Sequence, residues 1–158
     1  MRGGFTLIEL LVVISIIGLL ASVVLASLNS ARAKGRVANT AATLRQITTA
    51  LNFYLDTNGV YPCFDHTWDD TKEKTWSAPY IGWPKNPWGG NYHWEHNFGT
   101  GLQFSISVGS VPQAEGQALD KAIDDNNLLT GTVRSTDGGA RIEYGGMDQT
   151  VPFVDCHI

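Results

Sequence analysis

The chain has 158 residues, 43% of them hydrophobic, two cysteines and a formal net charge of −4 at neutral pH. This length allows one globular domain at most once an apolar amino-terminal segment is set aside. The charge is uneven: residues 29–50 carry four basic and no acidic side chains, whereas residues 51–158 carry six basic and fourteen acidic ones. An acidic carboxy-terminal region argues against a general nucleic-acid-binding function, which needs a basic surface.

An uncharged apolar run covers residues 10–28, and its only polar side chains are Ser15, Ser22 and Ser27. As a helix, 19 residues span about 28 Å, close to the roughly 30 Å hydrocarbon thickness of a bilayer. A cleaved secretory signal has a shorter apolar region of roughly 7–15 residues. The run therefore predicts a membrane-spanning helix, and Glu9 near its start needs a partner for its charge.

The residues that lead into this run read Gly3-Gly4-Phe5-Thr6-Leu7-Ile8-Glu9. This string, with the apolar run behind it, resembles the processing site of type IV pilins and of the pseudopilins of type II secretion. The resemblance covers about 30 residues and implies that a prepilin peptidase cuts after Gly4 and that the new amino terminus, Phe5, is methylated. It also implies that Glu9 meets the terminal ammonium of a neighbouring subunit in a filament. The alternative is an ordinary signal anchor, since the dipole of a helix tolerates a glutamate in its first turn.

The resemblance implies an α+β, type IV pilin-like fold, in which a long amino-terminal helix packs on a small antiparallel sheet. We expect a leader peptide at residues 1–4 and a transmembrane and assembly helix at 5–28. The soluble half of the same helix follows at 29–57, and a globular head occupies 58–158.

Apolar residues at helical spacing continue beyond the membrane run and predict a helix to Asp56, about 78 Å long if it is continuous from Phe5. The predicted buried stripe consists of Val37, Ala41, Leu44, Ile47, Thr48, Leu51, Tyr54 and Leu55. Gly59 suits the left-handed position that ends a helix. Many family members carry a proline within the apolar span; this chain has Val24-Leu25-Ala26-Ser27 there, with Gly18 and Gly35 as the candidate hinges.

An aromatic, turn-rich segment opens the head, and Pro84–Trp94 resembles the Asp-Pro-Trp-Gly…Tyr segment of major pseudopilins, with Asn86 at the usual aspartate. We interpret it as a core loop in which Trp88 and Tyr92 fill the space between sheet and helix. The alternative is a stacking platform for sugar or single-stranded nucleic acid. His93 and His96 suggest a metal pair only weakly, because no third ligand has a known spacing, and a surface loop is the preferred interpretation.

Residues 102–109 alternate apolar and small or polar side chains, which predicts a strand with one face toward the core. Ser110 and Gln113 resemble a capping box, predicting a helix to about Asp125. Its expected apolar side is Ala114, Ala118, Leu119, Ala122 and Ile123. Short strand candidates follow at residues 131–134, 141–144 and 151–154.

Major pseudopilins carry a calcium loop after a Ser-x-Gly, and Ser107-Val108-Gly109 fits its start, but Ser110 and Val111 follow instead of aspartates. A group of oxygen-bearing side chains lies further on: Asp120, Asp124, Asp125, Asn126 and Asn127. They lack the spacing of an EF-hand. We interpret them as a solvated helix end and predict no metal and no cofactor.

Cys63 and Cys156 are the only cysteines. In an exported protein an even pair indicates a disulfide, which would close a loop of 94 residues. In a reducing compartment the alternative is two unpaired buried thiols.

Two indicators of topology disagree. Arg2 precedes the apolar run and Arg32, Lys34, Arg36 and Arg45 follow it. Counting flanking positive charges places the head in the cytoplasm, whereas the resemblance and the cysteine pair place it outside. We follow the resemblance, and expect a single-pass protein of the cytoplasmic membrane that later enters an extracellular or periplasmic filament.

The sequence therefore predicts a structural subunit of a type IV pilus-like filament, made as a prepilin and polymerised with copies of itself through its apolar helix. No catalytic, phosphate-binding or dinucleotide-binding motif is found, so we predict no enzyme. A major-pseudopilin-like subunit of a type II secretion system is the alternative. More remote is a membrane-anchored extracellular binding domain that uses residues 1–28 as a tether.

Overall fold

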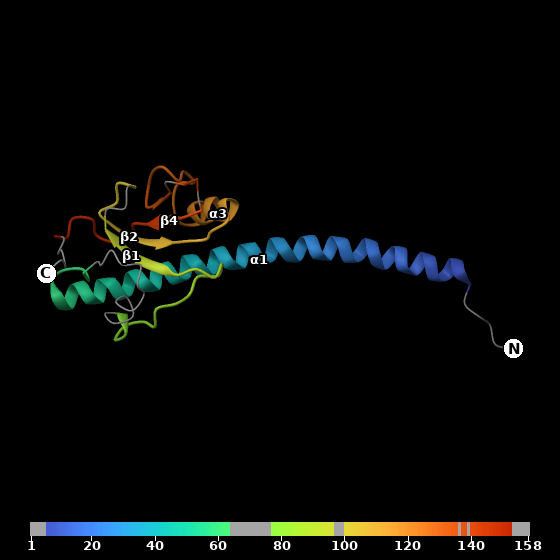
Figure 1. The fold of residues 1–158 in the computed structure, drawn as a ribbon, viewed down its shortest axis with the longest axis horizontal. Coiled ribbons are helices and arrows are strands. Elements are labelled where there is room, and N and C mark those ends of the chain that lie inside the picture. Colours follow the sequence, from blue (N-terminus) through green and yellow to red (C-terminus); the bar gives the residue numbers. More distant parts are fainter. Residues whose placement is uncertain (1–5, 64–76, 97–99, 136, 139, 153–158) are drawn as a thin grey trace. The chain divides into compact units, whose positions relative to one another are not determined.

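The computed structural model describes residues 6–63, 77–96, 100–135, 137–138 and 140–152. It divides into two compact units, Met1–Gly35 and Arg36–Ile158. The elements within the described residues are α1 (Leu7–Asn58), β1 (Tyr92–His96), β2 (Phe104–Val108), α3 (Gln113–Ile123), β3 (Val133–Arg134) and β4 (Ile142–Tyr144) (Figure 1).

The helix α1 has 52 residues and runs through Gly18 and Gly35 without interruption. It ends where the sequence predicts, because Gly59 takes a φ of +74° and its amide donates to the carbonyl of Leu55 at 2.7 Å. In the second unit, the α1 residues that are buried are Val37, Thr40, Ala41, Leu44, Ile47, Ala50 and Leu51. The predicted stripe is therefore confirmed at five positions, whereas Thr48, Tyr54 and Leu55 are half-buried.

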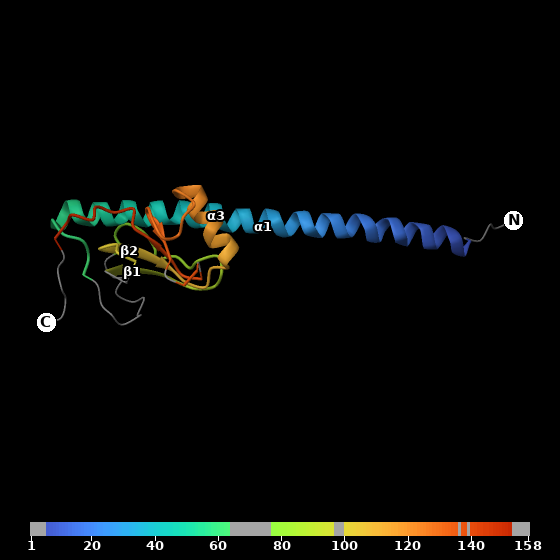
Figure 2. The ribbon, with the colours of Figure 1, turned by 90° about the horizontal axis from the view of Figure 1, so that it is seen from above.

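Four antiparallel strands form one sheet in the order β1-β2-β4-β3. Tyr92 pairs with Val108 across β1 and β2, and Ile106 pairs with Tyr144 across β2 and β4. Both views of the ribbon show β1 and β2 beside the second half of α1 (Figures 1 and 2). The helix on a small antiparallel sheet confirms the predicted α+β, pilin-like fold.

The core lies between α1 and one face of the sheet. Its sheet residues alternate along the strands, as period-two geometry requires: Tyr92, Trp94, Phe104, Ile106, Val108, Val133, Ile142 and Tyr144. At one end of the core, the rings of Tyr61 and Trp94 lie 5.5 Å apart and those of Trp94 and Phe104 are stacked at 5.6 Å. The indole of Trp94 donates to the carbonyl of Pro62 at 2.9 Å, so this buried polar group is satisfied.

The strand β1 was missed at the sequence level. Its residues include the histidine pair that we interpreted as a surface loop, and this interpretation is wrong because Trp94 and Glu95 are buried. Aromatic and turn-forming residues stand directly before this strand, at 87–91, and they obscure its alternation of apolar and polar side chains.

The strand β2 is confirmed with one face toward the core, since Phe104, Ile106 and Val108 belong to the core cluster. All five of its residues are buried, including Ser105 and Ser107. The face that carries these serines is occupied by charged side chains from β1 and β4.

The helix α3 begins later than predicted and is rotated. It starts at Gln113 behind Pro112, no side chain caps it, and Ser110 has a φ of +62° instead of a capping conformation. Its buried residues are Gly116, Leu119 and Asp120, whereas Ala114, Ala118 and Ala122 are exposed. The predicted apolar side is therefore wrong except at Leu119 and at the half-buried Ile123.

The last strand candidates are partly confirmed. β3 and β4 fall inside the ranges predicted for them, at residues 131–134 and 141–144. Val151 and Pro152 are not in a strand, and residues 153–154 lie outside the described residues.

Candidate functional site: the amino-terminal half of α1

The start of α1 is closed by a reciprocal pair of side chains, Thr6 and Glu9. The Thr6 amide and hydroxyl donate to Oε2 of Glu9 at 2.8 and 2.7 Å, and the Glu9 amide donates to the Thr6 hydroxyl at 3.3 Å. This is a capping box, whose Thr-x-x-Glu signature stands in the sequence and was missed there. Both bonds to the carboxylate go to Oε2, and no hydrogen bond of the described residues reaches Oε1.

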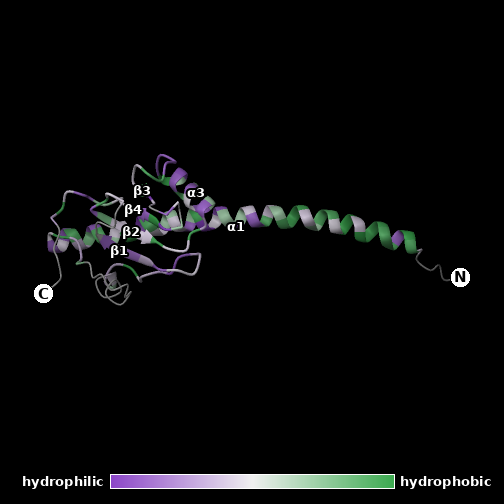
Figure 3. Ribbon diagram, turned by 45° about the horizontal axis from the view of Figure 1, so that its top comes forward, coloured by the Kyte–Doolittle hydropathy of each residue, from purple (hydrophilic) through white to green (hydrophobic). Residues whose placement is uncertain are grey.

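The helix surface that follows is apolar and unburied. An 18-residue window within α1 has a mean hydropathy of 2.8 and none of it is buried, so the helix is long and apolar enough to cross a membrane (Figure 3). Its exposed large residues are Leu7, Ile8, Leu10, Leu11, Val12, Val13, Ile14, Ile16, Ile17, Leu19, Leu20, Val23, Val24, Leu25 and Leu28. A continuous apolar surface of this size is not stable in water and marks contact with lipid or with another protein.

Two of the three serines within this surface, Ser15 and Ser22, do not oppose burial in an apolar medium. Ser15 donates to the carbonyl of Leu11 at 2.8 Å, and Ser22 donates to that of Leu19 at 2.7 Å. A hydroxyl that is bonded to its own helix loses little when water is removed. Glu9 is thus the one carboxylate of this segment, and among the described residues its Oε1 accepts no hydrogen bond.

The other predicted site residues belong to the second unit or lie outside the described part. Gly4 and Phe5 precede it and are not described, and neither is Cys156. Cys63 is described and exposed, in the second unit. The pairing of Cys63 with Cys156 therefore stays a prediction.

The aromatic segment of the head packs as a core element. Tyr92 is fully buried and Trp88 is half-buried against the core, which confirms the core interpretation over an open stacking platform. Asn86 organises the turn, since its Oδ1 accepts the amides of Trp88 and Gly90, each at 3.0 Å, and its Nδ2 donates to the carbonyl of Gly109 at 2.9 Å. An aspartate could accept the first two bonds but could not donate the third.

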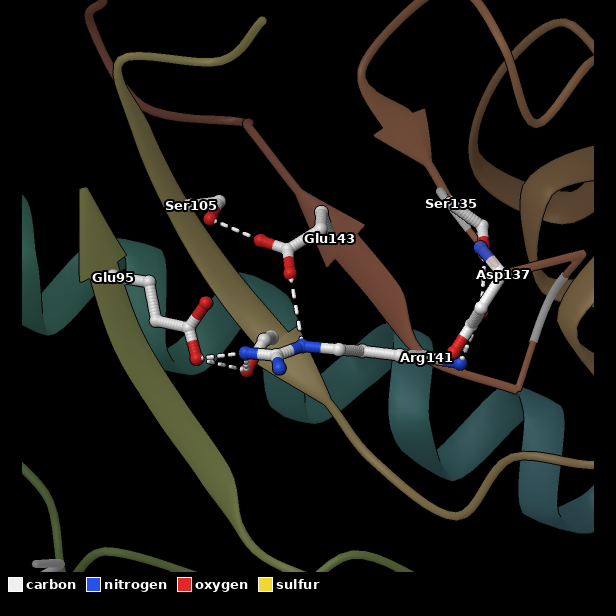
Figure 4. Close-up of polar contacts among 7 residues, drawn as sticks. Glu95, Ser105, Ser135, Asp137, Arg141 and Glu143 are labelled. Carbon is white, nitrogen blue, oxygen red and sulfur yellow. Dashed lines mark hydrogen bonds and ion pairs between the residues drawn. The ribbon is translucent and has the colours of Figure 1, made fainter. Parts of the chain in front are cut away.

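A buried charged cluster covers the outer face of the sheet, on the side away from the core (Figure 4). Arg141 pairs with Glu95 and, at 3.1 Å, with Glu143, while Ser105 and Ser107 donate to the two carboxylates. Burial is the largest cause that raises the pKa of Glu143, to about 7, and burial also raises the pKa of Glu95. The guanidinium of Arg141 is thus the counter-charge of two buried carboxylates. Ser105 and Ser107 of β2 donate to these carboxylates and are buried with them.

The aspartates at the end of α3 also depart from the sequence interpretation. Asp120 is fully buried, so describing this group as a solvated helix end is wrong at that position. Asp124 is half-buried and Asp125 is exposed.

Two models of known protein families match the chain. Residues 1–25 match the model of the prokaryotic N-terminal methylation motif. Residues 27–126 match the model of the type II secretion system (T2SS), protein G. The chain belongs to the type II secretion system protein G family.

Two proteins similar to this member of the protein G family are both named type II secretion system core protein G. The protein of Vibrio cholerae serotype O1 is 27% identical over 136 residues, which cover 80% of this chain and 93% of the relative. The protein of Aeromonas hydrophila is 33% identical over 101 residues, or 58% of this chain and 71% of the relative. The predicted type IV pilin-like filament subunit is confirmed at the level of the family, and the pseudopilin alternative is the one that the named relatives match.

Proposed function

We propose that this protein G family member is a structural, non-enzymatic subunit of a type II secretion pseudopilus. It is inserted in the cytoplasmic membrane as a precursor with its head outside, cut after Gly4 by a prepilin peptidase and methylated at Phe5. It then polymerises through residues 5–28. The observation that carries this proposal is the unburied apolar surface of α1 with one incompletely bonded carboxylate at its start.

The role of Glu9 follows from its two oxygens. Oε2 is held by Thr6, which keeps the carboxylate at the helix start and fixes its rotamer. Oε1 is left to accept a hydrogen bond from the methylated ammonium of Phe5 in a neighbouring copy. Because an unpaired carboxylate in an apolar filament core is strongly penalised, the pair selects one axial offset between neighbours.

Substitutions at Glu9 separate the pairing role from the capping role. Glu9→Val removes both, while Glu9→Gln keeps the capping box, in which glutamine also functions, but removes the charge. We expect both variants to insert in the membrane and both to lower the filament yield about ten-fold or more, because neither can form the ion pair. The measurement is the sheared filament fraction against the membrane fraction, quantified by immunoblot.

Ser15→Ala is the matched control, since Ser15 lies in the same exposed helix and bonds only its own backbone. It should leave the filament yield unchanged. A Glu9→Gln variant that assembles like the wild type would refute the ion pair and leave capping as the role of Glu9. Mass spectrometry of the same wild-type preparation tests processing: a mature chain must begin at methylated Phe5, whereas an intact Met1 favours the tether alternative.

A further inference from the structure

Two basic side chains, Arg32 and Lys34, follow the apolar surface of α1, and we call them the collar. Both are exposed and belong to the same compact unit as the apolar run. Neither makes an ion pair or a side-chain hydrogen bond with any residue of the described part. No acidic residue lies between Glu9 and Asp56, so α1 itself offers the collar no counter-charge one turn away.

The collar lies at the depth of lipid headgroups when residues 10–28 span a bilayer. Arg32 is four residues beyond Leu28 and Lys34 is six, which is about 6 and 9 Å along a helix. The headgroup region extends roughly 5–7 Å beyond the hydrocarbon on each side. Helical side chains lean toward the amino terminus, which in α1 is the direction of the apolar run, so both long side chains reach back toward this region.

The two charges of the collar lie on different sides of the helix. Successive residues of an α-helix are turned by about 100°, so Arg32 and Lys34 are about 200° apart around α1. A protein partner contacts one face of a helix, whereas lipid headgroups surround it. The arrangement of the collar therefore fits a lipid surface better than one protein partner.

The next two basic residues of α1 differ from the collar. Arg36 is half-buried and already pairs with Glu115. Arg45 is exposed, but it is 17 residues beyond Leu28, about 26 Å along a helix. This is about 20 Å beyond the headgroups, more than twice the Debye length of about 8 Å at physiological salt. Arg45 therefore has the same charge as the collar without its access to lipid.

We propose that the collar binds phospholipids with anionic headgroups, in the leaflet on the head side of the membrane. The inference rests on the proposed function, because it needs residues 10–28 to span the bilayer. The guanidinium of Arg32 and the ammonium of Lys34 each donate to phosphate oxygens of the surrounding lipids. These two charges oppose a head-outside topology when flanking charges are counted, and anionic lipids give them a favourable place on that side.

The test is the set of lipids that the full-length chain retains. The chain is reconstituted in vesicles of equal parts phosphatidylcholine and phosphatidylglycerol and extracted in a mild detergent, and its bound lipids are counted by native mass spectrometry. One basic residue at a membrane surface favours anionic lipid about five-fold. We expect phosphatidylglycerol to be retained over phosphatidylcholine by about five-fold or more, and the preference to decrease as sodium chloride is raised.

Substitutions in one helix provide a matched comparison. Arg32→Gln and Arg45→Gln change the charge equally, but only Arg32→Gln should reduce the preference, by about five-fold. Combining Arg32→Gln with Lys34→Gln should abolish it. Equal retention of the two lipids by the wild type, an unchanged preference in the double variant, or equal losses in Arg32→Gln and Arg45→Gln would each overturn the proposal.

Alkaline carbonate extraction of the same vesicles separates this inference from the proposed function. A wild-type chain that carbonate releases is not inserted, which would contradict the membrane step of the proposed function and the collar with it. An inserted chain that retains both lipids equally would overturn the collar alone. Dimers in the mass spectra that disappear in the double variant, without any lipid preference, would assign the collar to contacts with a second copy of the chain instead.

Discussion

Thr6 and Glu9 show how one side chain can have two partners in succession. In the single chain, Glu9 closes the first turn of α1 through Oε2. In the proposed filament its other oxygen faces a neighbour's amino terminus. The capping bonds restrict the rotamer of Glu9 before assembly, which lowers the entropy that the intermolecular pair has to overcome.

The buried pair of glutamates makes the stability of the head depend on pH. The pKa of Glu143 is raised to about 7 in the folded state, above its ordinary 4.5, because of burial first and Glu95 next among the raising causes. The folded state therefore holds the proton of Glu143 more tightly than the unfolded state does. This stabilises the fold fully below pH 4.5, and the stabilisation is lost as the pH rises through 7. We expect the free energy of unfolding to fall by on the order of 3 kcal/mol between pH 4.5 and pH 8.

Glu143→Gln tests this dependence, because glutamine keeps the shape of the side chain and does not titrate. Chemical denaturation of the full-length chain in micelles, followed from pH 5 to pH 8, should show a much smaller slope for this variant. Asp148→Asn is the control, since the pKa of exposed Asp148 is lowered and its contribution lies below this window. An unchanged slope in Glu143→Gln would show that Glu143 is not the titrating group.

At the scale of elements, α3 is tied to α1 and to the aromatic segment by one residue. Oε2 of Glu115 accepts the guanidinium of Arg36 at 2.9 Å and the indole of Trp88 at 3.1 Å, and Oε1 pairs with Arg36 as well. The pKa of Glu115 is lowered, first by its hydrogen bond to Arg36. The Arg36 side chain is 36% exposed, so solvent weakens the pair.

A double-mutant cycle measures this link. Arg36→Ala and Glu115→Ala should each destabilise the head, with a coupling energy of about 1 kcal/mol that decreases at high salt. Glu115→Gln should cost less than Glu115→Ala, because the amide oxygen can still accept from Trp88. A coupling energy of zero would show that the two side chains act independently.

The burial of polar residues on the outer face of the sheet was not predictable from the sequence pattern. β1 and the outer face of β2 hold polar residues that are buried, and polar residues at alternating positions normally predict an exposed face. Here Glu95 of β1 and Glu143 of β4, the two strands that flank β2, both pair with Arg141 and accept hydrogen bonds from the serines of β2. A pattern within one strand contains no information about charges on the next one.

At the scale of the whole molecule, a bond between Cys63 and Cys156 would tie the carboxy terminus to the start of the head. The loop-entropy model predicts about 4–5 kcal/mol for a loop of this length. We therefore expect Cys63→Ser to lower the free energy of unfolding of the exported protein by about 4–5 kcal/mol. We also expect the denatured wild-type protein to contain no free thiol. Thiol titration under denaturing conditions gives the answer, and two free thiols in protein from the native host would contradict the bond.

The sequence alone was sufficient for the long apolar helix and for the class of fold. Glu9, the apolar run behind it and the helical stripe up to Leu51 are all local in the chain, and α1 displays them in a fixed order. Only the tertiary structure decided which polar groups lose contact with water. Asp120, Glu95 and Glu143 are buried because segments far apart in the chain cover them, and burial is a property of those contacts and not of any residue's neighbours in sequence.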